Sequence, residues 1–144
     1  MDYSQIFAIS AAGMSVERRR LEVAALNVAN AQSISGPDGQ GYRPQRVVVQ
    51  AIADARAGFE GLLGAGLAYT PVATVEATGA PDRKSYEPGN PLADAQGFIS
   101  YPGVDNLHEM MSIMSAMRAY EANVAAMNAA RSMALKALDI GGGA

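Results

Sequence analysis

Few residues in this 144-residue chain have the chemistry of a catalytic or metal-binding site. The single histidine, His108, stands close to Asp105 and Glu109, and an imidazole beside carboxylates can bind a metal ion or transfer protons. No further ligand and no partner of a catalytic triad follows at a defined spacing. An exposed or helix-capping role is therefore the favoured interpretation of His108.

Three carboxylates in a proline-rich stretch, Asp82, Glu87 and Asp94, form a second candidate site. Two carboxylates can act as acid and base in hydrolysis, but acidic residues among prolines and glycines are usually solvated turn residues. The glycines of residues 61–66 follow no clear strand and lack a phosphate-binding lysine. The sequence therefore predicts no enzyme, no cofactor and no metal, with a carboxylate hydrolase as a distant alternative.

Any such group would have to be positioned by two long amphipathic helical segments, one at each end of the chain. Each segment repeats large apolar residues every seven positions, the period that keeps one narrow seam facing a partner helix. The predicted seam of the first segment is Phe7, Met14, Leu21 and Val28. That of the last segment is Met110, Met117, Val124 and Leu138, with Arg131 in the same series and Ile113, Tyr120, Met127 and Ala134 three residues later. Such seams favour assembly with other chains.

The predicted fold class is mainly α, with the terminal helices forming a coiled-coil-like pair and a small β-rich, loop-rich middle segment. The first helix is expected to run from Asp2, a weak N-cap, to about residue 31, because residues 36–41 are rich in glycine and proline. The last helix is expected from about residue 105 to residue 140, with Asn106 and Glu109 as a capping pair.

Strands are expected in the middle segment, which has β-branched runs. The predicted ranges are 42–52, 67–78 and a short piece at 97–101, with a variable loop at 53–66. Prolines confine any further strand to short edge pieces. The helical assembly domain is then predicted to be discontinuous, from 1–32 and 104–141, with residues 33–103 as the middle segment.

A few polar residues accompany the apolar helix faces and are predicted to belong to the assembly interface. Asn30 either caps the end of its helix or, like Asn27 beside the Val28 seam, supplies a buried amide that fixes the register between helices. Tyr120 and Asn123 either stabilise their own helix or bond across packed helices. Arg131 either extends to solvent or, as we prefer, pairs across a contact between subunits.

Composition argues against several functions. The formal net charge is −3 and no block is strongly basic, which disfavours a nucleic-acid surface. Cysteine is absent, so disulfides and thiolate metal sites are excluded. No apolar run reaches the roughly 18 residues of a membrane span, and the first residues lack the basic region of a secretory signal. If the chain leaves the cytoplasm, we expect another export route.

Several motifs resemble a known family. The sequence LNVANA at 26–31 resembles the N-terminal signature of bacterial flagellar rod and hook proteins, and GYRPQRVV at 41–48 resembles the segment that follows it. More specific are YEPGNPLADAQGFISYP at 86–102, EMM at 109–111 and RAYEANV at 118–124. Together these motifs are similar to those of a proximal rod subunit within this family of axial proteins.

The resemblance implies a structural subunit of the rod, which crosses the periplasm and transmits torque from the motor to the hook. It also implies export through the flagellar type III apparatus without a cleaved signal peptide. The implied partners are other proximal and distal rod proteins, the adaptor between rod and export gate, and copies of the same chain. The terminal helices are expected to be partly disordered in the free chain. A cytoplasmic helical adaptor or secretion chaperone using the same seams is the alternative.

Overall fold

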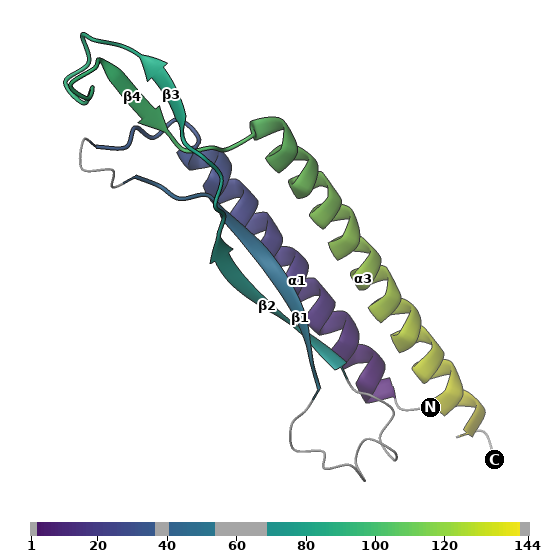
Figure 1. The fold of residues 1–144 in the computed structure, drawn as a ribbon. Helices are drawn as coiled ribbons and strands as arrows, with labels where there is room; N and C mark the ends of the chain where they lie inside the picture. Colours follow the sequence, from purple (N-terminus) through teal and green to yellow (C-terminus); the bar gives the residue numbers. More distant parts are fainter. Residues whose placement is uncertain (1–2, 37–40, 54–68, 142–144) are drawn as a thin grey trace. The chain divides into compact units, whose positions relative to one another are not determined.

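The computed structural model describes residues 3–36, 41–53 and 69–141. Along the sequence, one long helix precedes four strands and a second long helix follows them (Figure 1). The elements are α1 Tyr3–Asn30, β1 Gln45–Ala53, β2 Tyr69–Ala77, β3 Arg83–Tyr86, β4 Phe98–Tyr101 and α3 Asn106–Gly141. The helices have 28 and 36 residues, whereas each strand has nine or four. The prediction of a mainly helical chain with a strand-containing middle region is confirmed, and coiled-coil pairing stays a prediction.

Helix α1 forms because its sequence is rich in alanine and contains no proline. It ends at Asn30, one residue before the predicted limit. The side-chain amide of Asn30 donates to the carbonyl of Leu26 at 2.8 Å, and the amide and hydroxyl of Ser33 donate to the carbonyl of Asn30 at 3.0 and 2.8 Å. The two bonds from Ser33 satisfy a carbonyl that the last helical turn leaves without a helical partner. The predicted N-cap, Asp2, lies outside the described residues.

Helix α3 begins with a side-chain cap. The Asp105 Oδ1 atom accepts from the backbone amides of Leu107 at 3.0 Å and His108 at 3.3 Å. A carboxylate in this position satisfies free amides and lies favourably against the positive end of the helix dipole. The capping pair predicted from Asn106 and Glu109 is therefore wrong, because Asp105 is the capping residue and the Glu109 carboxylate bonds elsewhere.

The strands of the described residues form two separate two-stranded sheets, β1 with β2 and β3 with β4. Strands β1, β2 and β4 match the predicted segments within a few residues, whereas β3 was not predicted individually. In the antiparallel β3–β4 sheet, Tyr86 pairs with Phe98 and their rings meet edge to face, with centroids 5.2 Å apart. Of the predicted loop at 53–66, all but residue 53 lies outside the described residues.

Packing divides the chain into two compact units, and both helices contribute to each. We call them the first unit (Met1–Arg19, Val49–Thr74 and Ala116–Ala144) and the second unit (Arg20–Val48 and Val75–Ser115). Apart from Pro44 and Pro102, the buried residues of the described chain are Ser10, Val16, Ala116 and Ala130 in the first unit and Val23, Ala24, Asn27, Ala31, Ser35 and Ile99 in the second. Neither described helix combines the length and apolar character needed to cross a membrane.

Candidate assembly surface

Asn27 is the most highly connected polar residue at the end of α1, and its side chain lies in the second unit at 1% exposure. Its Nδ2 group donates to the carbonyl of Gln45 at 2.8 Å and to Oε1 of Glu109 at 2.9 Å. Its Oδ1 atom accepts from the amide of Gln45 at 2.9 Å and from the Tyr42 hydroxyl at 2.7 Å. The buried amide thus uses both its donors and both its acceptor positions.

These bonds join three parts of the second unit: the end of α1, the approach to β1 and the first turn of α3. Burial raises the pKa of the Tyr42 hydroxyl, and the negative charge of Glu109 raises it further. Both effects disfavour the phenolate. Tyr42 is therefore held in the protonated form that donates to Asn27, and the network fixes which residues of α1 and α3 meet.

The other two asparagines bond within their own helices. The Asn30 amide reaches the carbonyl of Leu26 in the preceding turn, and the Asn123 amide reaches the carbonyl of Ala119 at 2.9 Å. In the first unit, Asn123 also lies against Gly13 of α1, where an added Cβ would stand 2.7 Å from its Oδ1 atom. Within the chain, Asn27 bonds between segments, whereas Asn30 and Asn123 bond within their own helices, and an interface role for these residues stays a prediction.

The predicted seam of α1 is half-buried, and the fully buried residues lie beside it. All four seam residues, Phe7, Met14, Leu21 and Val28, are of intermediate exposure. Val16 and Val23 are both 5% exposed and lie seven residues apart, two positions after Met14 and Leu21. The seven-residue period is thus present in α1, and its most buried positions are filled by smaller side chains.

In α3 the buried positions precede the predicted series by one residue. Ala116 and Ala130 are 2% and 1% exposed, whereas Met117 is 50% exposed and Arg131 is exposed as well. Of the remaining predicted residues, Ile113, Asn123, Val124 and Met127 are half-buried, and Met110, Tyr120 and Leu138 are exposed. Small residues therefore face the protein's own interior, and several large ones do not. Whether the predicted residues contact other chains stays a prediction.

Large apolar side chains gather on the side of α3 opposite Ala116. We call this set the outer face of α3: Leu107, Met110, Met111 and Met114, which are 58–69% exposed. Their spacings of three and four residues place them on one side of the helix. Exposed apolar patches of this kind mark interaction surfaces, and methionine adapts its shape to different neighbours. The outer face of α3 is therefore the candidate assembly surface.

The candidates for chemistry do not form a site. His108 is exposed, and the described part of the chain contains no group of three or more histidine, cysteine or acidic residues able to hold a metal ion. Asp94 organises the turn before β4, because its Oδ1 atom accepts from the amides of Gln96 and Phe98, both at 2.9 Å. The bond from the Phe98 amide is the main cause that lowers the pKa of Asp94. This carboxylate supports a loop.

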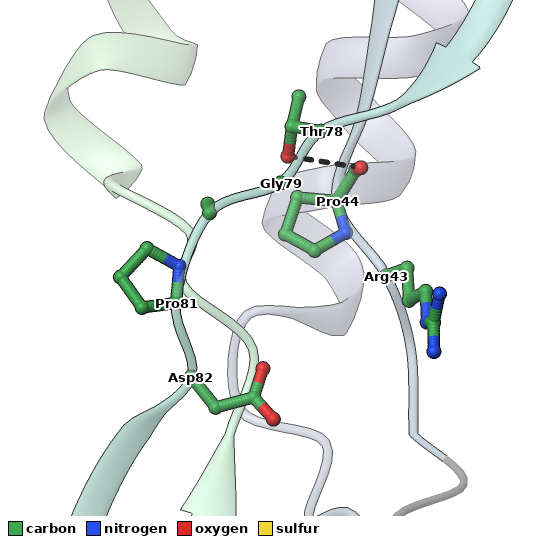
Figure 2. Close-up of a pocket in the computed structure, with 7 residues that line it drawn as sticks. Arg43, Pro44, Thr78, Gly79, Pro81 and Asp82 are labelled. Carbon is green, nitrogen blue, oxygen red and sulfur yellow. Dashed lines mark hydrogen bonds between the residues drawn. The ribbon is translucent and has the colours of Figure 1, made fainter.

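A shallow groove of about 310 Å³ in the second unit also lacks the features of a catalytic site. Figure 2 shows the Thr78 hydroxyl bonded to the carbonyl of Pro44, at 3.1 Å, where the two walls of the groove approach each other. Arg43 and Asp82 line it with exposed side chains, and Thr78 is half-buried. With no buried ionisable group among its lining residues, the groove lacks the environment that tunes a catalytic acid or base.

Comparison with known proteins identifies the class. A sequence model described as "Flagellar basal body rod FlgEFG protein C-terminal" matches residues 95–140, which contain β4 and nearly all of α3. The matched segment thus carries the outer face of α3. The class that this match and the two long helices define is that of structural proteins of the flagellar basal body.

Curated relatives identify the family. The chain is 46% identical over 136 residues to the flagellar basal-body rod protein FlgC of Escherichia coli O6:H1, which covers 94% of this chain and 96% of the relative. It is 44% identical to FlgC of Salmonella typhimurium, with the same coverage, and 42% identical to FlgC of Yersinia enterocolitica, over 98% and 99% of the two chains. The chain belongs to the family of flagellar basal-body rod proteins FlgC. It is a structural protein and not an enzyme.

The sequence did not reveal the hydrogen-bond partners of Asn27, nor which seven-residue series of each helix is buried. Tyr42, Gln45 and Glu109 lie 15, 18 and 82 residues from Asn27, so no local spacing connects them. The buried series of α3 had a weak signal in the sequence, because small and polar residues also repeat every seven positions at Glu109, Ala116, Asn123 and Ala130. A series of small and polar residues is not recognised as a seam when a methionine series runs beside it.

Proposed function

We propose that this protein is a subunit of the proximal rod, and that its terminal helices pack with those of neighbouring subunits to build the periplasm-crossing drive shaft. The observation that carries the proposal is the outer face of α3, whose four large apolar side chains are more than half exposed. In an isolated chain this face leaves apolar area in water, and packing it against another helix would remove that area. The FlgC relatives support a place in the rod.

The proposed mechanism of torque transmission is mechanical. A tube whose wall is made of interdigitated helices resists shear because its side chains are packed at crystal-like density. The Asn27 network fixes the meeting point of α1 and α3 within one subunit, so each copy presents its outer face in the same geometry. The neighbours are other proximal and distal rod proteins, the adaptor at the export gate and copies of this chain, and export uses the flagellar type III apparatus.

A pair of charge-introducing variants on one helix tests this function. Met114→Asp places a carboxylate in the centre of the outer face, and His108→Asp introduces the same charge in the first helical turn, beside that face. We expect Met114→Asp to abolish swimming and to remove the protein from purified hook–basal bodies while export continues. His108→Asp should swim normally, because an acidic residue near a helix N-terminus is favourable. Normal swimming of Met114→Asp would contradict the proposal.

The alternative of a cytoplasmic adaptor or secretion chaperone is distinguished by the same preparation. A rod subunit remains in hook–basal bodies after extraction of the membrane and cytoplasmic proteins, whereas an adaptor stays in the soluble fraction. Detection of the protein in purified hook–basal bodies by mass spectrometry is the expected result.

A further inference from the structure

Methionine is concentrated on the outer face of α3. Six of the eight methionines of the chain lie on this helix, and three of them, Met110, Met111 and Met114, belong to the outer face. These three are 58–63% exposed, and no other methionine falls within the residue ranges of the second unit. The second unit therefore presents all its thioether sulfurs to solvent on one side of a single helix.

An exposed thioether reacts with two-electron oxidants of the peroxide class. One oxygen atom of the peroxide passes to the sulfur, the O–O bond breaks, and the remainder of the peroxide leaves as water. The sulfur is oxidised by two electrons, and the flexible apolar side chain becomes a polar sulfoxide. Because the chain contains no cysteine, no thiol of its own competes for the oxidant.

The free subunit tolerates this change, whereas a helix contact does not. The three side chains face water in the free chain, so each new S=O group keeps its hydrogen bonds to solvent. When another helix covers the face, the same oxygen leaves water and costs free energy unless the neighbour supplies a donor. Sulfoxide formation therefore acts on assembly and leaves the fold of the second unit in place.

We propose that the outer face of α3 is a redox-sensitive modification site, at which oxidation of Met110, Met111 and Met114 to sulfoxide prevents the subunit from entering the rod. The subunit is open to this reaction between its export and its incorporation, because neighbours cover the face afterwards. The inference rests on the proposed rod function and adds the regulation of the same surface.

A competition between two chains in the same cell tests the proposal. Cells without the natural gene express the natural chain together with a chain that carries Met110→Leu, Met111→Leu and Met114→Leu. Leucine keeps an apolar side chain of similar helix propensity but cannot be oxidised at sulfur. Mass spectrometry measures the ratio of the two chains in purified hook–basal bodies, with and without a sublethal dose of peroxide during assembly.

We expect both chains to enter the basal bodies of untreated cells in proportion to their expression. Peroxide should enrich the leucine chain by about tenfold, because one buried polar group without a partner costs enough to shift an equilibrium by that factor. The natural chain left outside the basal bodies should carry sulfoxide at the three positions. Since both chains meet the same oxidised neighbours, damage to other rod proteins cancels from the ratio.

The outcomes separate the inference from the proposed function. An unchanged ratio, in cells whose unassembled natural chain is oxidised at the three methionines, would overturn the inference and leave the rod function standing. Absence of the natural chain from the basal bodies of untreated cells would overturn the rod function itself.

A glutamine variant imitates the sulfoxide without any oxidant. Met110→Gln, Met111→Gln and Met114→Gln together place polar, unbranched side chains of similar helix propensity on the outer face. The free chain should keep the circular dichroism of the natural chain and be excluded from hook–basal bodies.

The matched control is Met133→Gln, which changes a methionine of the same helix that is 55% exposed and lies in the first unit. This variant should enter hook–basal bodies normally. Normal incorporation of the triple variant would overturn the proposal, and exclusion of both variants would show that the effect does not belong to the outer face.

Discussion

The two units of this protein hold their helix segments in different ways. In the second unit, the buried Asn27 side chain makes four hydrogen bonds that connect α1, residues 42–45 and α3. In the first unit, Gly13 allows Asn123 to approach closely, but the side-chain bond of Asn123 goes to Ala119 of its own helix. A satisfied polar network specifies one register, whereas close packing of small residues permits approach with less selectivity.

This difference indicates which unit is stable in the free chain and which unit depends on contacts with neighbouring subunits. The largest fully buried side chain of the second unit is that of Ile99, at 1% exposure, and the same unit contains the completed hydrogen-bond network of Asn27. In the described part of the first unit the buried residues are small, and Leu138 and Ile140 near the end of α3 are 70% and 84% exposed. We therefore expect the second unit to carry most of the stability of the free chain.

The largest expected effect follows from breaking the Asn27 network. Asn27→Leu leaves the Tyr42 hydroxyl and both polar backbone groups of Gln45 without their partner, and we expect the free energy of unfolding to fall by about 2–4 kcal/mol. Chemical denaturation of the purified chain, followed by circular dichroism, measures the change.

The matched control is Asn30→Leu, one turn away on the same helix. Its amide is exposed and bonds only within α1 among the contacts described, so the loss should stay near 0.5 kcal/mol. An equal fall in the free energy of unfolding for Asn27→Leu and Asn30→Leu would show that the buried network stabilises the chain no more than the exposed bond of Asn30.

A smaller effect is expected from the close approach in the first unit. Replacing a glycine inside a helix by alanine usually gains about 1 kcal/mol, but a Cβ at Gly13 collides with the Asn123 amide. Gly13→Ala should therefore gain little in the natural chain and about 1 kcal/mol in an Asn123→Ala background. Denaturation of the four chains of this double-mutant cycle gives the coupling. The same gain in both backgrounds would mean that the two residues do not meet.

The smallest effect is local and depends on pH. The pKa of Asp94 lies below its ordinary value of 3.8, chiefly because its carboxylate accepts from the Phe98 amide. A depressed pKa contributes stability above pH 3.8 that is lost as the pH falls through the folded-state pKa. We expect the Gln96 and Phe98 amides to lose hydrogen-exchange protection on acidification, relative to the known acid dependence of unprotected amides.

Asp94→Asn supplies the control for that experiment, because an amide oxygen still accepts hydrogen bonds but does not titrate. Protection in this variant should not depend on pH in the same range. An identical acid response in both chains would assign the effect to another group.

The extent of both helices could be predicted from the sequence because strong local signals bound them. Alanine-rich stretches end at residues 31–41 and at the glycines from residue 141, and the helices end at Asn30 and Gly141. Strand β3 is harder, because four residues with the pattern Arg-Lys-Ser-Tyr carry no alternation of apolar residues. It pairs because the turn held by Asp94 brings β4 back alongside it.

The seven-residue period of burial in the helices could be predicted from the sequence, but which series of residues is buried could be predicted only in part. Large residues were expected to face a partner helix, yet the chain's own interior is lined at Ala116 and Ala130 by small residues, which allow close approach. The Met110 and Met117 positions are left exposed. A single sequence gives the repeat but does not say which of two adjacent series meets which partner. Asn27 was expected at an interface between helices, which stays a prediction, and its partners within the chain come from distant parts of the sequence.

Oxidation of the outer-face methionines tests most directly whether other chains cover this surface. Purified free chain and purified hook–basal bodies are treated with the same dose of peroxide, and sulfoxide formation at Met110, Met111 and Met114 is measured by mass spectrometry. All three are more than half exposed in the chain alone, so they should oxidise readily there and be protected in the basal body. Equal oxidation in the two preparations would contradict the account.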